Sequence, residues 1–280
     1  DMVRARTNPV MRPEMMHGYQ DPRPTSPPDW RSSHAGRNCS HTMEPAFLPG
    51  TLSLPGIRTM RLLIFDIDGT IMLNGPIAGN LFVESFARVV GIPPVEGVHF
   101  HGNTDRGIFR AMLDGRGDFD NLYPRFAEEF SRRMRAEYVA AEGPYVLDGA
   151  RELIETLHAH DGAALALGTG NVRETAYTKL GRFGLDSYFP VGGFGGDHEV
   201  RPDLVKAAAA DARAHYDVDF DPAETWVIGD TAADVAAAPA AGCRVMAVMT
   251  GPHRESELSG ADLIVEDLAA TAERIQQLIG

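Results

Sequence analysis

The sequence has only two cysteines, Cys39 and Cys243, which stand far apart in regions of different composition. A disulfide framework is therefore not indicated, and a reducing, cytoplasmic location is expected. No apolar run approaches the roughly 18 residues that a membrane-spanning helix needs, and no internal repeat is visible.

Positive charge is also scarce, because 26 Lys and Arg residues face 39 Asp and Glu residues, for a formal net charge of −13. This balance disfavours nonspecific binding to nucleic acid or to an anionic membrane surface, although a local basic site can still bind a phosphate group.

The chain is nevertheless long and apolar enough for a sizeable core, with 280 residues of which 44% are hydrophobic. That length predicts one large or two small domains. Residues 1–58 differ from the rest, being rich in Pro, Arg, Ser and His without a sustained hydrophobic period. We expect them to be disordered. The alternative is that they are not native sequence, since Met60 stands directly before the first expected strand.

One stretch combines a buried strand with acidic residues. The apolar run 62–65 ends in Asp66 and Asp68, followed by Gly69 and Thr70. This pattern predicts a parallel strand with two carboxylates at its C-terminal end, where open α/β sheets place their chemistry. Alternation would put both carboxylates on one side, and two such charges need a cation or a shared proton nearby.

After Gly143 the pattern alternates between helix and strand, which is typical of a parallel sheet. A helix is expected over 150–157 and further strands over 163–167, 225–228, 244–249 and 263–265. The strand 163–167 leads into a loop that holds Thr169, Gly170 and Asn171. Asn171 with Glu174 resembles a capping pair that would start the next helix, so we expect an anion site at this loop.

Two further strand ends carry charged residues. Arg201, before an alanine-rich helix, could meet a phosphate or pair with Glu199 on the surface. Asp230 and Asp234 follow the strand 225–228, and they share one helix face if the helix starts at once. Oxygen ligands of this kind suit Mg²⁺.

The hydrophobic pattern of residues 75–143 predicts helices, and this segment lacks strand-like runs. Apolar stripes predict packed helices over 77–90 and around 126–138, with a short helix over 108–113 between them.

A polar cluster precedes that short helix. Its members His101, Asn103, Thr104, Asp105 and Arg106 are the candidates for contact with a substrate's leaving group. The alternative is that Thr104 is a helix N-cap and the histidine is a surface residue.

Successive strand ends thus carry a carboxylate pair, a hydroxyl, a basic residue and a second carboxylate pair. In this order the chain resembles the haloacid dehalogenase superfamily, in its phosphatase branch with a helical cap, over about residues 60–270. The resemblance is carried by Asp66-Ile-Asp68-Gly-Thr70 as first motif, Thr169 as second and Gly229-Asp230-Thr-Ala-Ala-Asp234 as fourth. The third motif usually holds Lys, whereas this sequence offers Arg201-Pro202, with Lys206 and Lys179 as substitutes. The identity of the phosphate-binding cation is therefore left open.

The resemblance implies an α/β fold, with a Rossmann-like three-layer parallel sheet as the core and an inserted small α-helical cap domain. The core would comprise 59–74 and 144–280, and the cap 75–143.

The resemblance also implies roles for the residues of the motifs. Asp66 would be a nucleophile that forms an aspartyl phosphate, and Asp68 a general acid and base. From its closeness to two other negative groups, we expect the proton affinity of Asp68 to be raised. Thr70 would orient the nucleophile loop and, with the loop residues Gly170 and Asn171, lie at the phosphate.

A metal and two phosphate ligands complete the implied site. Mg²⁺ would be held by Asp66, by the backbone carbonyl of Asp68 and by Asp230, with Asp234 either a ligand or just behind them. Thr169 and Arg201 would bind the phosphoryl oxygens.

The expected function is a Mg²⁺-dependent phosphatase for a small phosphorylated metabolite, because a cap would hinder a protein substrate. Phosphoglycolate fits the resemblance, but nothing in the sequence selects it. The alternatives are a phosphomutase of the β-phosphoglucomutase kind and a non-catalytic phosphate-binding protein. Dehalogenation is disfavoured, because dehalogenating members of the family lack the second aspartate of the first motif. The sequence does not specify an oligomeric state.

Overall fold

The computed structural model describes residues 60–274 and 278–279. The prediction of disorder for residues 1–58 therefore lies outside the described residues. None of the helices in the described part of the chain combines the length and the apolar character that a bilayer crossing requires.

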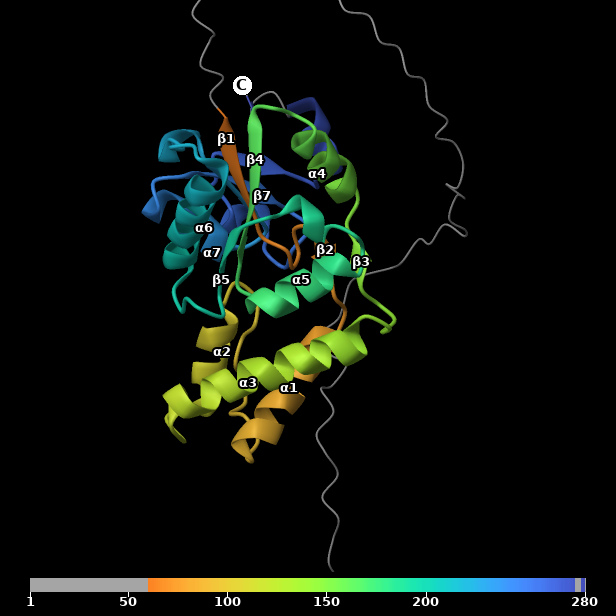
Figure 1. Ribbon diagram of the computed structural model, residues 1–280, viewed down its shortest axis with the longest axis vertical. Helices are drawn as coiled ribbons and strands as arrows, with labels where there is room; N and C mark the ends of the chain where they lie inside the picture. Colours follow the sequence, from red (N-terminus) through yellow and green to blue (C-terminus); the bar gives the residue numbers. More distant parts are fainter. Residues whose placement is uncertain (1–59, 275–277, 280) are drawn as a thin grey trace, which may run out of the picture. The chain divides into compact units, whose positions relative to one another are not determined.

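A six-stranded parallel sheet forms the centre of the fold, in the order β5-β4-β1-β6-β7-β8 (Figure 1). Its strands are β1 (Arg61–Phe65), β4 (Ala163–Thr169), β5 (Gly192–Phe194), β6 (Trp226–Gly229), β7 (Arg244–Val248) and β8 (Leu263–Val265). Strand β1 is central and almost wholly apolar, as a strand with both faces covered must be. This arrangement confirms the expected α/β fold with a parallel sheet.

Helices cover both faces of the sheet (Figure 1). They are α4 (Ala150–His158) and α5 (Arg173–Gly181) on one face, and α6 (Arg201–Tyr216) and α7 (Ala232–Ala240) on the other. Alternate residues of β1 divide between two cores, because Leu62 and Ile64 pack with α6 and α7 while Leu63 and Phe65 pack on the opposite side.

The edge strand β5 is absent from the sequence-based prediction. Its residues Gly192 and Gly193 lack the side chains that mark a strand in sequence. A Cβ at Gly193 would overlap the backbone carbonyl of Leu204 in α6, so glycine allows this helix to pack directly on the sheet edge.

The predicted helical segment contains α1 (Ile77–Val90), α2 (Asp105–Leu113) and α3 (Phe119–Arg133), which continues into the π-helical turn η2 (Met134–Tyr138). Helix α1 ends as predicted at Gly91, which has a left-handed backbone with φ of 79°. Phe82, Phe109 and Phe126 join the three helices through ring contacts.

Two short strands flank this helical segment. Strands β2 (Met72–Leu73) and β3 (Tyr145–Val146) pair in antiparallel fashion, one before α1 and one after η2. The assignment of residues 75–143 as a separate cap domain stays a prediction.

Candidate active site

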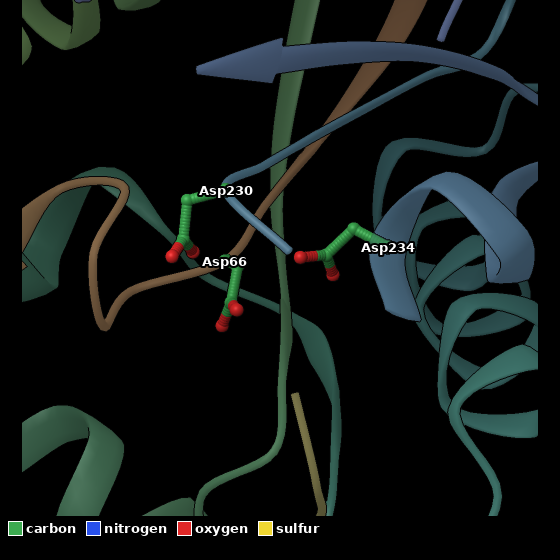
Figure 2. Close-up of side chains that lie close together, drawn as sticks. All are labelled: Asp66, Asp230 and Asp234. Carbon is green, nitrogen blue, oxygen red and sulfur yellow. The ribbon is translucent and has the colours of Figure 1, made fainter. Parts of the chain in front are cut away.

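Three carboxylates converge at the C-terminal edge of the sheet (Figure 2). Asp66 follows β1, Asp230 follows β6, and Asp234 lies in the first turn of α7. Each offers an oxygen atom, and these oxygens lie within 4.8 Å of one another. A shared helix face for Asp230 and Asp234 was conditional on a helix that starts at once, and that condition is not met, because Thr231 caps α7 and the helix begins at Ala232. Asp230 therefore belongs to the loop, and only Asp234 is helical.

One buried cation lies among these carboxylates. Arg201, whose side chain is 7% exposed, donates from Nη2 to Asp66 and from Nε to Asp234 Oδ1 at 2.8 Å. Three carboxylates and one guanidinium leave a formal charge of about −2 when all are ionised.

Burial and this excess of negative charge together make the acids of the cluster harder to ionise. Burial raises the pKa of Asp66 to about 6; the guanidinium of Arg201 opposes the shift, and the charges of Asp234 and Asp68 add to it. Burial, followed by the charges of Asp66 and Asp234, also raises the pKa of Asp230. Such a site favours a divalent cation, which would offset the unbalanced charge.

The residues around Asp230 hold its carboxylate in place within the carboxylate cluster. The fully buried hydroxyl of Thr70 donates to Asp230 Oδ1 at 3.1 Å. A Cβ at Gly69 or Gly251 would overlap the carboxylate, so the two glycines form a slot around it. Gly69 also has a φ of 86°, which only glycine adopts readily. Thr70, predicted at the phosphate, thus has Asp230 as its partner here.

The carboxylate of Asp234 is already engaged within the protein. Its Oδ1 accepts from Arg201, and its Oδ2 accepts from the backbone N–H and hydroxyl of Thr231, at 3.1 and 2.6 Å. Asp234 thus accepts three hydrogen bonds, against two for Asp66 and one for Asp230, so Asp66 and Asp230 are better placed to contact a metal directly, with Asp234 orienting Arg201.

Asp68 lies apart from this cluster, with a side chain that is 40% exposed. Lys179 donates to both of its oxygens at 2.8 Å, Asn171 donates to Oδ2 at 2.7 Å, and Asn74 donates to Oδ1. Burial opposes ionisation here, but the ammonium of Lys179 and these hydrogen bonds outweigh it and lower the pKa of Asp68. The expectation of a raised proton affinity is therefore wrong, because it counted the acidic neighbours and missed Lys179.

The loop after β4 differs from its prediction in one respect. Helix α5 begins at Arg173 after Val172, without a side-chain cap, so the expected capping pair of Asn171 and Glu174 is wrong. Asn171 instead accepts from Lys179 at 2.6 Å and donates to the buried hydroxyl of Thr169 at 2.7 Å. The side chain of Asn171 therefore binds Lys179 and Thr169 and does not cap α5.

An acidic side chain of the helical segment, Asp105, lies at this helix start. The backbone N–H of Val172 donates to Asp105 Oδ2 at 2.8 Å, and the N–H of Asp105 donates to the carbonyl of Gly170 at 2.7 Å. Burial raises the pKa of Asp105 to about 7, although the charge of Lys179 opposes this shift.

Its neighbours in the polar cluster also have partners. Thr104 caps α2 by accepting from Gly107, as the alternative predicted, and donates to the carbonyl of Glu199. The guanidinium of Arg106 lies 4.8 Å from the ring centroid of Phe119. Contact of Thr104, Asp105 and Arg106 with a substrate stays a prediction.

The three candidate cations now have distinct positions. Arg201 lies in the carboxylate cluster, Lys179 at Asp68, and Lys206 is exposed. The contact of Lys179 with Asp68 is not among the sequence-based expectations; the sequence signal for it is the place of Lys179 on the buried stripe of α5, beside Ala176 and Leu180. Asn74 has no such signal, because a single amide in a loop forms no pattern.

Comparison with known proteins agrees with this geometry. The family model described as haloacid dehalogenase-like hydrolase matches residues 60–242, which hold all four acidic residues of the site. A phosphoglycolate phosphatase of Chromobacterium violaceum is 28% identical over 221 residues, covering 76% of this chain and 95% of that protein. Hexitol phosphatase A of Escherichia coli is 27% identical over 210 residues, covering 73% and 90%.

Solved structures share the fold. A hydrolase of Pseudomonas syringae superposes with a TM-score of 0.58 at 21% identity, covering 79% of this chain and 100% of that one. The family model spans both the strand that presents Asp66 and the helix that presents Asp234, so the match includes the whole carboxylate cluster. The chain belongs to the haloacid dehalogenase-like hydrolases.

Proposed function

We propose that the protein is a Mg²⁺-dependent phosphatase that hydrolyses a small phosphorylated metabolite through an aspartyl phosphate on Asp66. The observation that carries this proposal is the pair of aspartates in separate environments: Asp66 in a buried acidic cluster and Asp68 outside it, held by Lys179. A nucleophile and an acid–base group need such different surroundings. Two curated relatives are phosphatases of small phosphorylated compounds, which supports the same reaction.

Asp66 is suited to attack phosphorus. Its Oδ1 accepts from the N–H of Ile67 at 2.7 Å and its Oδ2 accepts from Arg201, so the carboxylate is fixed before substrate binds. A guanidinium has five N–H donors, and these contacts of Arg201 use only Nε and Nη2. The remaining donors supply charge to phosphoryl oxygens, together with the hydroxyl of Thr169. Mg²⁺ bound by Asp66 and Asp230 would further offset the negative charge of the phosphoryl group.

Asp68 performs the proton transfers. Its lowered pKa makes it ionised before substrate binds, so the proton for the leaving oxygen has to arrive with the substrate. A phosphate monoester has a second pKa of about 6 and so carries a proton in part of its population near neutrality. As the bond to the leaving oxygen breaks and that oxygen becomes basic, Asp68 relays the proton to it from the phosphoryl oxygen. It then accepts a proton from the water that attacks the aspartyl phosphate.

The substrate and its access complete the proposal. We assign residues 75–143 as the cap domain, because α2 contacts the strand-end loops through Asp105 and Gly170. A cap in this position favours small metabolites, and the polar cluster 101–106 would contact the leaving group. A cytoplasmic location belongs to the same proposal.

A hydrolysis screen across a panel of phosphorylated metabolites tests this function. We expect inorganic phosphate to be released from at least one small phosphate ester, to stop on chelation with EDTA and to return with Mg²⁺. Conversion of a sugar phosphate into its isomer without phosphate release would identify a mutase instead. Binding without turnover of any ester would favour the non-catalytic alternative.

The glycine slot around Asp230 provides a separate test of the metal site. Gly251→Ala places a methyl group against the Asp230 carboxylate and should weaken Mg²⁺ binding by about 10–100-fold, as loss of support for a ligand typically does. Gly79→Ala is the matched control, since no atom lies within 4 Å of a Cβ at that helical position. Isothermal titration with Mg²⁺ measures both variants, and equal affinities would contradict the placement of the metal at Asp230.

A further inference from the structure

We infer that Tyr138 positions Asp68 for proton transfer, acting through Asn74. This inference rests on the phosphatase reaction proposed above. It assigns a role to a residue of the helical segment that does not touch the reacting atoms. The contacts concerned run from Tyr138 Oη to the amide of Asn74 and from that amide to Asp68 Oδ1.

The two hydrogen bonds run in the same direction along this chain of contacts. The hydroxyl of Tyr138 donates to Asn74 Oδ1, and Asn74 Nδ2 donates to Asp68 Oδ1. Asn is one of the few side chains that can donate at one end and accept at the other, and Asp at position 74 would place two carboxylates together.

Tyr138 is itself held firmly. Its side chain is fully buried at the end of the π-helical turn η2, and such turns occur often at functional sites. Arg182 donates to the carbonyls of Tyr138 and Ala141 at 2.5 and 2.6 Å, which fixes the chain just after the turn.

Helix α5 connects both ends of this arrangement. It carries Lys179, which holds Asp68 directly, and Arg182 follows three residues later at its C-terminal cap. One helix therefore fixes both the acid and the turn that holds Asn74. Asp68 lies in the loop after strand β1, and its side-chain rotamer is held by the hydrogen bonds from Lys179, Asn171 and Asn74.

Loss of the Tyr138 hydroxyl should therefore release Asn74 to flip, which would turn an amide oxygen toward Asp68 and move the carboxylate. Hydrolysis of the aspartyl phosphate needs Asp68 as a base whatever the substrate, so a difference between substrates should appear only in the step that releases the leaving group, which kcat/KM reports. Tyr138→Phe should lower kcat/KM about tenfold for an alkyl phosphate and about twofold or less for p-nitrophenyl phosphate, a part of the 10²–10⁴-fold that general acid catalysis supplies.

Tyr177→Phe is the matched control. Its hydroxyl also donates to one acceptor, the carbonyl of Phe189 at 2.9 Å, and its loss should change neither rate. Asn74→Ser is a second variant at a half-buried position, where the shorter side chain cannot bridge Tyr138 and Asp68. Melting temperatures of the three variants separate folding defects from the kinetic effect, and Asn74→Ser decides the matter if Tyr138→Phe is unstable.

The expected result is a fall in the ratio of kcat/KM for the alkyl phosphate to kcat/KM for the aryl phosphate in Tyr138→Phe and Asn74→Ser, with the ratio of Tyr177→Phe equal to that of the wild type. An unchanged ratio in both site variants, in a protein whose wild type hydrolyses both esters, overturns the inference alone. A wild type that hydrolyses neither ester overturns the proposed function, and this inference with it.

Discussion

Asp66→Asn is expected to abolish turnover of every phosphate ester, by at least about 10⁴-fold, because the amide cannot act as the nucleophile. The substitution keeps the shape of the side chain and removes one of the clustered buried charges. Since burial raises the pKa of Asp66, the neutral amide is tolerated and the melting temperature of the metal-free protein should not fall. Steady-state phosphate release and thermal unfolding measure the two effects.

Asp219→Asn serves as the control for this variant. Asp219 has a side chain that is 79% exposed and pairs with Arg213 on the surface, so its amide should leave turnover and melting temperature unchanged. Substantial turnover in Asp66→Asn, with the control at wild-type activity, would reject Asp66 as nucleophile.

Asp68→Asn is expected to separate substrates by their leaving group. Alkyl phosphates should lose roughly 10²–10⁴-fold, because their alkoxide needs a proton. With p-nitrophenyl phosphate the phenolate leaves unaided, so the aspartyl phosphate forms but breaks down slowly for lack of a base. Stopped-flow absorbance should show a burst of one nitrophenol per active site, followed by a much slower steady state.

Loss of the carboxylate also leaves Lys179 buried without its charge partner, so some destabilisation should accompany this variant. The burst amplitude does not depend on this destabilisation when the amplitude is divided by the concentration of folded protein. Equal losses on both substrate classes without a burst would show that Asp68 is not the general acid.

Much of the sheet could be predicted from the sequence because its strands are buried on both faces. The apolar run before Asp66 forms β1 as expected, and the strand expected over 225–228 lies within one residue of the fully buried β6. The two carboxylate pairs are recognisable because parallel strands end at one edge, so that Asp66 and Asp230 meet there although 164 positions separate them in the numbering (230 − 66).

Other features depend on tertiary contacts that leave no local pattern. Gly193 lets α6 pack closely on the sheet, and the need for glycine there follows only from the position of the Leu204 backbone in the fold. Asn171 has the sequence context of a helix cap, but its amide forms hydrogen bonds with Lys179 and Thr169 instead. The charge state of Asp68 depends on Lys179, which is 111 residues away in the chain. Contacts between residues so far apart in the chain cannot be predicted without knowing the fold.

The central claim is that the phosphoryl group passes through a protein carboxylate before it reaches water, and the stereochemistry at phosphorus tests it most directly. A substrate made chiral at phosphorus with oxygen isotopes is hydrolysed by the wild-type protein, and the configuration of the released phosphate is determined. Two successive in-line displacements, first by Asp66 and then by water, predict retention of configuration. Inversion would show a single direct attack by water and would contradict the account.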